Sequence, residues 1–285
     1  MNECILPVLE KMGIEPGTRN GLPVLHIKNP YAEAEVSLYG AHVLSYIPKG
    51  EKDLLWISGK SWFEEGKPIR GGIPVCWPWF GPAAKPNHGV ARISMWEMEA
   101  TRVEADMSTT LVFFLDKQDF CGMTARLLVN IGPSLSLALR TRNHSMYSCT
   151  LSEALHTYFA VKDISKVSIL GLEQNDLPEE EKLFPNLRKG RLTFRQETDL
   201  VCHPEEKILV IDDQGEGRKI RVERAGSASA VVWNPWIAKS KAMEDFGDDE
   251  YKTMVCVEAA NAKDGAVGII PGATHTLRTR ISLIR

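Results

Sequence analysis

Apolar and polar residues alternate along most of this chain with a period of two, which predicts β-strands rather than helices. The clearest alternating runs are EAEVSLYG, which ends at Gly40, and those at 92–105, 109–116, 124–131, 134–142 and 275–284. Gly, Pro, Asn and Asp separate the runs, as in NIGPSLS and IDDQGEGRK, and these residues form the tight turns of antiparallel sheets. Helical periodicity is best in the first dozen residues and in 236–246.

This pattern predicts an all-β fold, because many short strands with almost no βαβ alternation favour antiparallel sheets packed face to face. We expect a large β-sandwich with a few short helices. The chain has 285 residues, 44% of them hydrophobic, which is enough for a sizeable core. No linker, repeat or low-complexity segment divides it, so we expect one domain over residues 1–285. The acidic run at 176–183 is expected to be a solvated loop before a new strand.

Composition and charge narrow the classes of partner. A net charge of −3 and a pI near 6.2, without a dense Lys/Arg cluster, argue against a nucleic-acid partner. Neither a signal sequence nor a run of 18 apolar residues is present, so we expect a cytoplasmic monomer with no membrane partner. The cysteines have irregular spacing without a Cys-x-x-Cys pair, which predicts reduced, packed thiols; they are Cys4, Cys76, Cys121, Cys149, Cys202 and Cys256.

Residues 68–92, PIRGGIPVCWPWFGPAAKPNHGVAR, suit neither a helix nor a strand. Arg70, Asn87, His88 and Arg92 bracket prolines, glycines and aromatic residues. These polar side chains could simply tie the loop to nearby carbonyl groups. Taken together, two guanidinium groups beside a rigid apolar surface predict a concave site that grips a phosphate or a carboxylate.

Three strand-like segments also carry polar residues in unexpected places. His156 interrupts the apolar run LSEALHTYFAV, although a single histidine in a strand is commonly a half-buried structural residue. Glu258 ends the apolar run MVCV, where an ionised carboxylate is costly unless it is paired or functional. Asp199 lies near a predicted strand end in FRQETDLV, which on its own is an ordinary position for aspartate.

A histidine and a carboxylate without a GxSxG elbow, an HExxH motif or clustered metal ligands predict proton transfer rather than covalent or metal chemistry. Ring opening and closing of a sugar hemiacetal needs only such a pair: one group removes the anomeric hydroxyl proton while the other protonates the ring oxygen. This reaction requires no cofactor and no metal.

The same segments resemble the glucose-6-phosphate 1-epimerase (hexose-6-phosphate mutarotase) family of the aldose 1-epimerase superfamily. The resemblance runs from about residue 20 to the end of the chain, and its most specific parts are the RGG to HG-x-AR span and the WNPW to CVEA block. The matching segments are GAHVLSY at 40–46, IRGGIPVCWPWFGP at 69–82, NHGVAR at 87–92, LHTYF at 155–159, ETDLV at 197–201, residues 231–262 and PG at 271–272.

The resemblance implies a galactose-mutarotase-like supersandwich that interconverts the α and β anomers of glucose 6-phosphate or a similar hexose phosphate. It implies that His156 is the general acid and Glu258 the general base. Arg70 and Arg92 match arginines at the substrate, where they would anchor its phosphate. The other matched positions are Asn87 and His88, a polar pair beside the substrate, and Asp199, which would bind a sugar hydroxyl.

Three positions depart from the family pattern. Trp79 replaces a common glutamine, Asn87 is one methylene shorter than the usual glutamine, and Leu200 stands where arginine is usual, which removes the expected support of the neighbouring aspartate. We expect Trp77, Trp79 and Phe80 to form a wall for the sugar, with core packing as the alternative for Trp77.

The other histidines are assigned to structure or surface; they are His26, His42, His144, His203 and His275. Two other functions stay open: a mutarotase of unphosphorylated aldoses and a non-catalytic sugar-phosphate-binding module.

Overall fold

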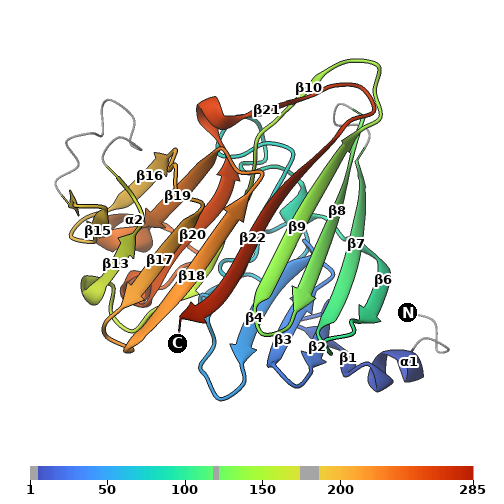
Figure 1. The fold of residues 1–285 in the computed structure, drawn as a ribbon, viewed down its shortest axis with the longest axis horizontal. Helices are drawn as coiled ribbons and strands as arrows, with labels where there is room; N and C mark the ends of the chain where they lie inside the picture. The colour runs from blue at the N-terminus through green and yellow to red at the C-terminus, as the bar shows by residue number, and fades with distance from the viewer. Residues whose placement is uncertain (1–5, 118–121, 174–185, 285) are drawn as a thin grey trace.

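A ten-stranded antiparallel sheet forms the front layer of the molecule in Figure 1. The computed structural model describes residues 6–117, 122–173 and 186–284. The order of strands in this sheet is β14-β15-β13-β17-β18-β22-β9-β8-β7-β6. Their bounds are β6 Glu97–Val103, β7 Thr109–Lys117, β8 Met123–Ile131, β9 Leu135–Asn143, β13 Val167–Leu170, β14 Leu187–Arg188, β15 Arg191–Thr193, β17 Ile208–Asp213, β18 Arg218–Ala225 and β22 Thr274–Ile284.

A six-stranded sheet packs against the first one, since β20 contacts both β18 and β22. Its order is β16-β19-β20-β11-β5, and β12 also pairs with β20. Its strands are β5 Val75–Cys76, β11 Glu153–Leu155, β12 Tyr158–Ala160, β16 Thr198–Cys202, β19 Ser229–Asn234 and β20 Met254–Asn261.

Two smaller sheets complete the β structure. Four consecutive strands form one of them, and a distant pair forms the other. The bounds are β1 Ile14–Arg19, β2 Leu22–Lys28, β3 Ala32–Ser37, β4 His42–Pro48, β10 Cys149–Leu151 and β21 Val267–Ile269.

The two large sheets enclose an apolar core because their strands alternate as the sequence predicts. In β9, Leu135, Leu137 and Leu139 are at most 1% exposed, whereas the intervening side chains lie on the outer face. Burial of each leucine contributes about 1.5–3 kcal/mol. Strand β20 differs, because all eight of its residues are buried. The side chains on one face of β20 therefore pack into the core. The side chains on its other face are also shielded from solvent, and this second face carries the candidate site.

The predicted all-β class is confirmed, and all six alternating runs contain strands. The run at 92–105 becomes a strand only at Glu97, because Ala91–Ile93 form a 3-10 turn, η1. Helices α1 Leu6–Lys11 and α2 Trp236–Ala242 match the two helical segments, but α2 ends before 246 because Met243 is extended and the buried Asp245 and Phe246 turn inward.

Three further 3-10 turns are described, η2 Ile164–Lys166, η5 Glu250–Thr253 and η6 Lys263–Gly265. The helices α1 and α2 have six and seven residues, and no helix in the described part of the chain is long and apolar enough to span a membrane. The predicted acidic loop at 176–183 lies outside the described residues, as do Cys4 and Cys121. The other four cysteines are buried thiols without disulfides among the described residues.

Candidate active site

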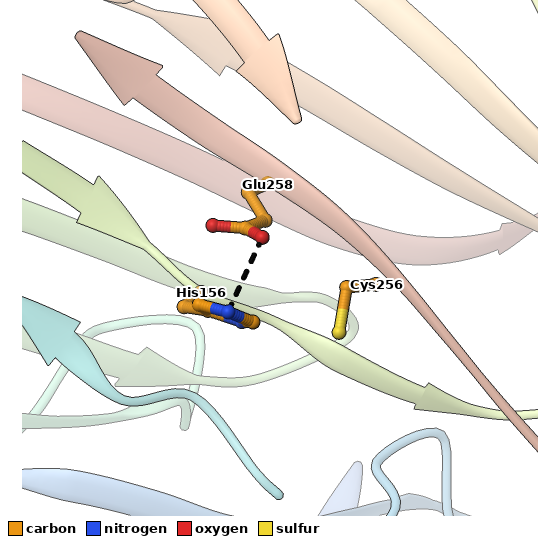
Figure 2. A group of neighbouring side chains, drawn as sticks. All are labelled: His156, Cys256 and Glu258. Carbon is orange, nitrogen blue, oxygen red and sulfur yellow. Dashed lines mark ion pairs between the residues drawn. The ribbon is translucent and has the colours of Figure 1, made fainter. Parts of the chain in front are cut away.

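Strand register brings His156 and Glu258 together although 102 residues separate them in sequence. Strands β11 and β12 both pair with β20, with Leu155 opposite Ala259 and Tyr158 opposite Cys256. The same register continued through the short gap between β11 and β12 places His156 directly opposite Glu258. Side chains opposite each other on one face of an antiparallel pair are in contact distance. The Nε2 atom of His156 lies 3.4 Å from Oε1 of Glu258 (Figure 2).

The floor of the site is one face of the six-stranded sheet. Because side chains alternate along each strand, the neighbours of Glu258 on this face come from β12, β19 and β16. Register places Val231 opposite Glu258, and Trp233 opposite both Cys256 and Asp199. Tyr158 stacks on His156 with ring centroids 4.7 Å apart and an interplanar angle of 10°. The imidazole is therefore held in a fixed orientation by rings on its own face of the sheet.

The 68–92 loop forms the wall above this floor, and two of its glycines are required by close backbone approaches. Gly71 has φ +118°, and a Cβ there would lie 2.4 Å from the carbonyl oxygen of Trp56. Gly89 has φ +76°, and a Cβ there would lie 2.0 Å from the carbonyl oxygen of Trp77. Side chains at these positions would push the loop out of place. The glycines of the RGG and HG-x-AR motifs are thus required by the backbone conformation of the loop, in addition to the chemical roles of the arginines in these motifs.

Arg70 reaches the site already paired with a carboxylate. Its Nε and Nη2 donate to the two carboxylate oxygens of Asp245 at 3.1 and 3.2 Å, and its Nη1 donates to the Tyr158 hydroxyl at 3.0 Å. The Asp245 side chain is 5% exposed and that of Arg70 is 19% exposed. This bidentate, sheltered pair fixes the guanidinium group and neutralises most of its charge.

Arg92 differs from Arg70 because it has no carboxylate partner among the described residues. Its Nη2 donates to the backbone oxygen of Asn87 at 2.7 Å, and its Nε is buried without a hydrogen bond. Arg92 therefore offers a less neutralised positive charge to a ligand than Arg70 does.

The remaining polar residues of the loop lie beside these cations. His88 has φ +62° and its Nδ1 accepts a hydrogen bond from the Gly81 backbone at 3.3 Å. Burial, followed by the charges of Arg92 and Arg70, lowers the pKa of His88 to about 3. His88 is consequently a neutral imidazole at physiological pH, and Asn87 stands at the exposed rim beside it.

The expectation of a three-ring wall is wrong in part. Phe80 lines the cavity and contacts the His88 ring edge-on, with ring centroids 4.8 Å apart. Trp77 is fully buried and donates to the Thr141 hydroxyl at 2.9 Å, so core packing explains it. Trp79 donates to the Pro86 carbonyl at 2.9 Å and does not line the cavity. Both indoles satisfy their N–H groups within the protein, which directs them away from the site.

Asp199 lies at the open side of the cavity, supported by a lysine from another element. Lys239 of α2 approaches Glu197 at 2.7 Å and Asp199 at 3.5 Å. The neighbouring Leu200 is 1% exposed and points the other way. Lys239 thus supplies the cation that the sequence lacks at position 200.

All seven predicted site residues line one cavity of about 980 Å³, a volume suited to a small-molecule ligand. They are Arg70, Asn87, His88, Arg92, His156, Asp199 and Glu258. His42, which we assigned to the fold, lies underneath: its Nε2 contacts the carbonyl oxygen of Gly71 at 2.7 Å, and burial lowers its pKa to about 4. The predicted residues therefore converge in space from four segments of the chain, the 68–92 loop and the segments around His156, Asp199 and Glu258.

Burial controls the protonation of the His156–Glu258 pair. It raises the pKa of Glu258 well above its ordinary value, with the charge of Asp199 adding to the effect. It lowers the pKa of His156 well below its ordinary value, helped by His88, Arg92 and Arg70. Both directions favour the neutral forms in the unliganded protein, a protonated Glu258 carboxyl group and an uncharged His156 imidazole. The two groups line the cavity from neighbouring strands, an arrangement that general acid/base chemistry can use.

Comparison with known proteins agrees with this geometry. A family model described as aldose 1-epimerase matches residues 23–282. The chain belongs to the aldose 1-epimerase family. Within this family it is 37% identical, over 270 residues, to an Escherichia coli protein named "Putative glucose-6-phosphate 1-epimerase", with 92% of this chain and 89% of that protein covered. A protein of Cenchrus ciliaris with the same name is 36% identical over 270 residues, covering 88% of this chain and 81% of that protein.

Solved structures show the same fold. A crystal structure described as "a putative mutarotase" from Salmonella typhimurium superposes with a TM-score of 0.85 at 31% identity, covering 95% of this aldose 1-epimerase family member and 94% of that chain. A galactose mutarotase-like protein from Clostridium acetobutylicum has a TM-score of 0.70 at 12% identity, over 95% and 98% of the two chains. The second likeness concerns the fold alone, and it confirms the predicted galactose-mutarotase-like sandwich.

Four residues of the site were missed by reasoning from the sequence. Tyr158 could have been found, because it lies two residues from His156 and therefore on the same face of the strand. Trp233 could not, because it neighbours Glu258 only through the pairing of β19 with β20. Asp245 and Lys239 carried no such signal, since a charged residue near a helix is ordinary and their partners are distant in sequence.

Proposed function

We propose that this aldose 1-epimerase family member interconverts the α and β anomers of a hexose 6-phosphate, with glucose 6-phosphate as the expected substrate. The observation that carries the proposal is the buried His156–Glu258 pair at 3.4 Å, opening into a cavity whose wall holds two guanidinium groups. The names of the relatives support the same reaction. The cytoplasmic location and the monomeric state expected from the sequence stay predictions.

In the proposed reaction the pair moves one proton in a cycle. The Glu258 carboxylate removes the proton from the anomeric hydroxyl, the imidazolium of His156 protonates the ring oxygen, and the bond between the anomeric carbon and the ring oxygen breaks. The open-chain aldehyde then rotates about its C1–C2 bond. Ring closure on the other face reverses both transfers: neutral His156 takes the proton back and Glu258 returns one to the new anomeric hydroxyl. No proton is gained or lost overall, and no cofactor takes part.

A phosphate on the substrate explains how the acid becomes charged. In the unliganded protein the charges of Arg92 and Arg70 help to keep His156 neutral. A phosphate group carries a charge of about −1.5 to −2 at pH 7, so its binding at these guanidinium groups would offset their repulsion of an imidazolium. The proton of the pair would then move from Glu258 to His156, which is the state that opens the ring. On this account the phosphate raises kcat as well as lowering KM.

Arg92 is the stronger phosphate anchor of the two, because Arg70 is neutralised by Asp245. A charge-assisted hydrogen bond contributes roughly 1.5–3 kcal/mol net. Loss of one such bond in an Arg92→Ala variant corresponds to roughly a 10- to 150-fold loss of kcat/KM on a phosphorylated sugar. Asn87, His88 and Asp199 would contact sugar hydroxyls around the rim.

The test is an anomerisation assay by saturation-transfer NMR with glucose, galactose and mannose, each with and without the 6-phosphate. We expect the 6-phosphate to raise kcat/KM, and Arg92→Ala to remove that advantage while leaving the activity on glucose little changed. Arg126→Ala is the matched control, because Arg126 is an arginine on the outer face of β8 that pairs with Glu99 and does not line the cavity. Equal rates on glucose and glucose 6-phosphate would support the mutarotase of unphosphorylated aldoses instead. Tight binding with no rate above the spontaneous one would support the non-catalytic binding module.

A further inference from the structure

Three metal-ligating side chains meet at the floor of the cavity, and the proposed reaction uses only two of them. A ring nitrogen of His156, the thiol sulfur of Cys256 and a carboxylate oxygen of Glu258 all lie within 4.8 Å of one another. Figure 2 shows Cys256 and Glu258 on one strand, with the imidazole of His156 facing them. The residues at 256 and 258 share a strand face, so this arrangement is built into β20 rather than produced by a flexible loop.

The separations fit a tetrahedral zinc-type ion. Typical zinc bond lengths of about 2.0–2.1 Å to nitrogen, 2.0–2.2 Å to oxygen and 2.3 Å to sulfur require tetrahedral ligand atoms to lie about 3.4 Å apart for nitrogen and oxygen, and about 3.6 Å apart for sulfur with either of the others. The His156–Glu258 separation is 3.4 Å, which already matches. The sulfur separations, at 4.8 Å or less, need a movement of about 1.2 Å at most, which a cysteine rotation and small shifts of its partners can supply.

The ligands are also chemically available. Both carboxylate oxygens of Glu258 are buried, and neither has a hydrogen bond to any residue that the structure describes. Glu258 and Cys256 are 0% exposed. A buried, unsatisfied carboxyl group costs free energy, and a bound cation would relieve that cost. One thiolate and one carboxylate balance the two charges of the ion, so the filled site is neutral despite the guanidinium groups nearby.

Ligand type decides which ion the site prefers. One sulfur, one nitrogen and one oxygen donor suit Zn²⁺ and chemically similar ions such as Co²⁺ and Cd²⁺, whereas Mg²⁺ and Ca²⁺ favour all-oxygen sites. His156 and Glu258 line the cavity, whereas Cys256 does not, so an ion would enter from the cavity and keep its fourth position open to it.

We propose that Cys256, Glu258 and a ring nitrogen of His156 form a binding site for one Zn²⁺-type ion, and that the metal-bound protein cannot catalyse anomerisation. When the ion binds, the Cys256 thiol and the Glu258 carboxyl group each release one proton to solvent as the metal–sulfur and metal–oxygen bonds form. The general base and the general acid then both become metal ligands, and neither can transfer a proton. The ion therefore competes with the sugar for the same two groups. Metal binding does not depend on the proposed function, but the inhibition rests on it.

The binding test uses chelator-treated protein titrated with Zn²⁺ by calorimetry. We expect one site per chain, and at least a tenfold weaker Kd in Cys256→Ser, because even an indirect supporting residue of a metal site is worth 10–100-fold in affinity. Cys149→Ser is the matched control, since Cys149 is another buried cysteine, in β10, outside the cavity, and its Kd should equal that of the wild type. Co²⁺ added to the wild type should give the thiolate-to-metal charge-transfer absorption and the strong visible bands of a tetrahedral site, which reports sulfur ligation even if the Cys256 variant does not fold.

The inhibition test measures anomerisation of glucose 6-phosphate at increasing Zn²⁺. We expect competitive inhibition that a chelator reverses. No stoichiometric binding, a Kd unchanged by Cys256→Ser, or a Co²⁺ spectrum without a thiolate band would overturn the site. Metal binding with full activity at saturating Zn²⁺ would overturn the inhibition. Metal binding in a protein that anomerises no sugar would refute the proposed function while leaving the site intact.

Discussion

Replacing Asp245 by asparagine separates the structural role of Arg70 from its role toward a phosphate. Asparagine keeps the shape of the side chain and one acceptor oxygen, but it removes the negative charge that faces Nε and Nη2 of Arg70 at 3.1 and 3.2 Å. The Tyr158 hydroxyl still accepts from Nη1, so Arg70 keeps its position. The Asp245→Asn variant thus exposes a fixed guanidinium group that lacks its counter-charge.

Two opposite effects follow, and their sizes can be worked out. Removing one partner of a buried pair costs 3–5 kcal/mol, and because Arg70 retains some contact with water and one hydrogen bond, we expect about 3 kcal/mol. For a chain of this length that lowers Tm by roughly 6 °C. A phosphate on the far side of the guanidinium group would lie roughly 7 Å from the removed charge, which at an effective dielectric constant of 20 is worth about 2 kcal/mol. Glucose 6-phosphate should therefore bind roughly 30-fold more tightly.

Calorimetric titration and thermal unfolding, each with glucose and with glucose 6-phosphate, measure both effects. Affinity for glucose should not change, and glucose 6-phosphate should raise Tm more in Asp245→Asn than in the wild type. Asp212→Asn is the control, because Asp212 pairs with Arg191 at 3.4 Å outside the cavity, and it should leave both affinities unaltered. Unchanged or weaker binding of glucose 6-phosphate to Asp245→Asn would refute the idea that Arg70 faces the phosphate.

Two further predictions concern pH and the rim of the cavity. The value of kcat/KM should stay level through pH 6.5. It should fall only well below that pH, where the His156–Glu258 pair gains a second proton, or above the raised pKa of Glu258, where the pair loses its single proton. A profile of kcat/KM that declines on the alkaline side of a single ionisation near 6.5 would contradict this. Lys239→Met should raise KM about two- to fivefold with little effect on kcat, since Lys239 supports Asp199 through an exposed ion pair and such a pair contributes 0.2–1 kcal/mol. Lys241→Met, on the same helix but outside the cavity, should behave as wild type. A loss confined to kcat in Lys239→Met would contradict the idea that Lys239 supports substrate binding through Asp199.

The alternating pattern was enough to predict the class of fold, because period-two alternation reports which face of a strand is buried. It could not predict which strands pair. The contact between His156 and Glu258 depends on β11 and β12 both lying in register with β20, and register is set by packing across the whole sheet rather than by local sequence. The resemblance in the sequence therefore identified the two residues, but only the structure shows that their side chains are close together.

The errors have physical causes of the same kind. Trp77 and Trp79 resembled a ligand-binding wall, but each indole N–H finds an acceptor inside the protein, Thr141 and the Pro86 carbonyl, and this decides their direction. The partner of Arg70 was not predicted because Asp245 lies 175 residues away and just beyond a helix. Pairing between distant charges leaves no periodic trace in a sequence.

The central claim is that Glu258 and His156 transfer protons to and from the anomeric centre. The most direct measurement is the exchange rate between the two anomers of glucose 6-phosphate, followed by saturation-transfer NMR with the wild type and with Glu258→Gln, which keeps the size of the side chain but cannot act as a base. Positioned acid or base groups contribute about 10²–10⁴ in rate, so kcat should fall by that factor while the circular dichroism spectrum and Tm show a folded protein. A folded Glu258→Gln protein that exchanges the anomers at the wild-type rate would contradict the account.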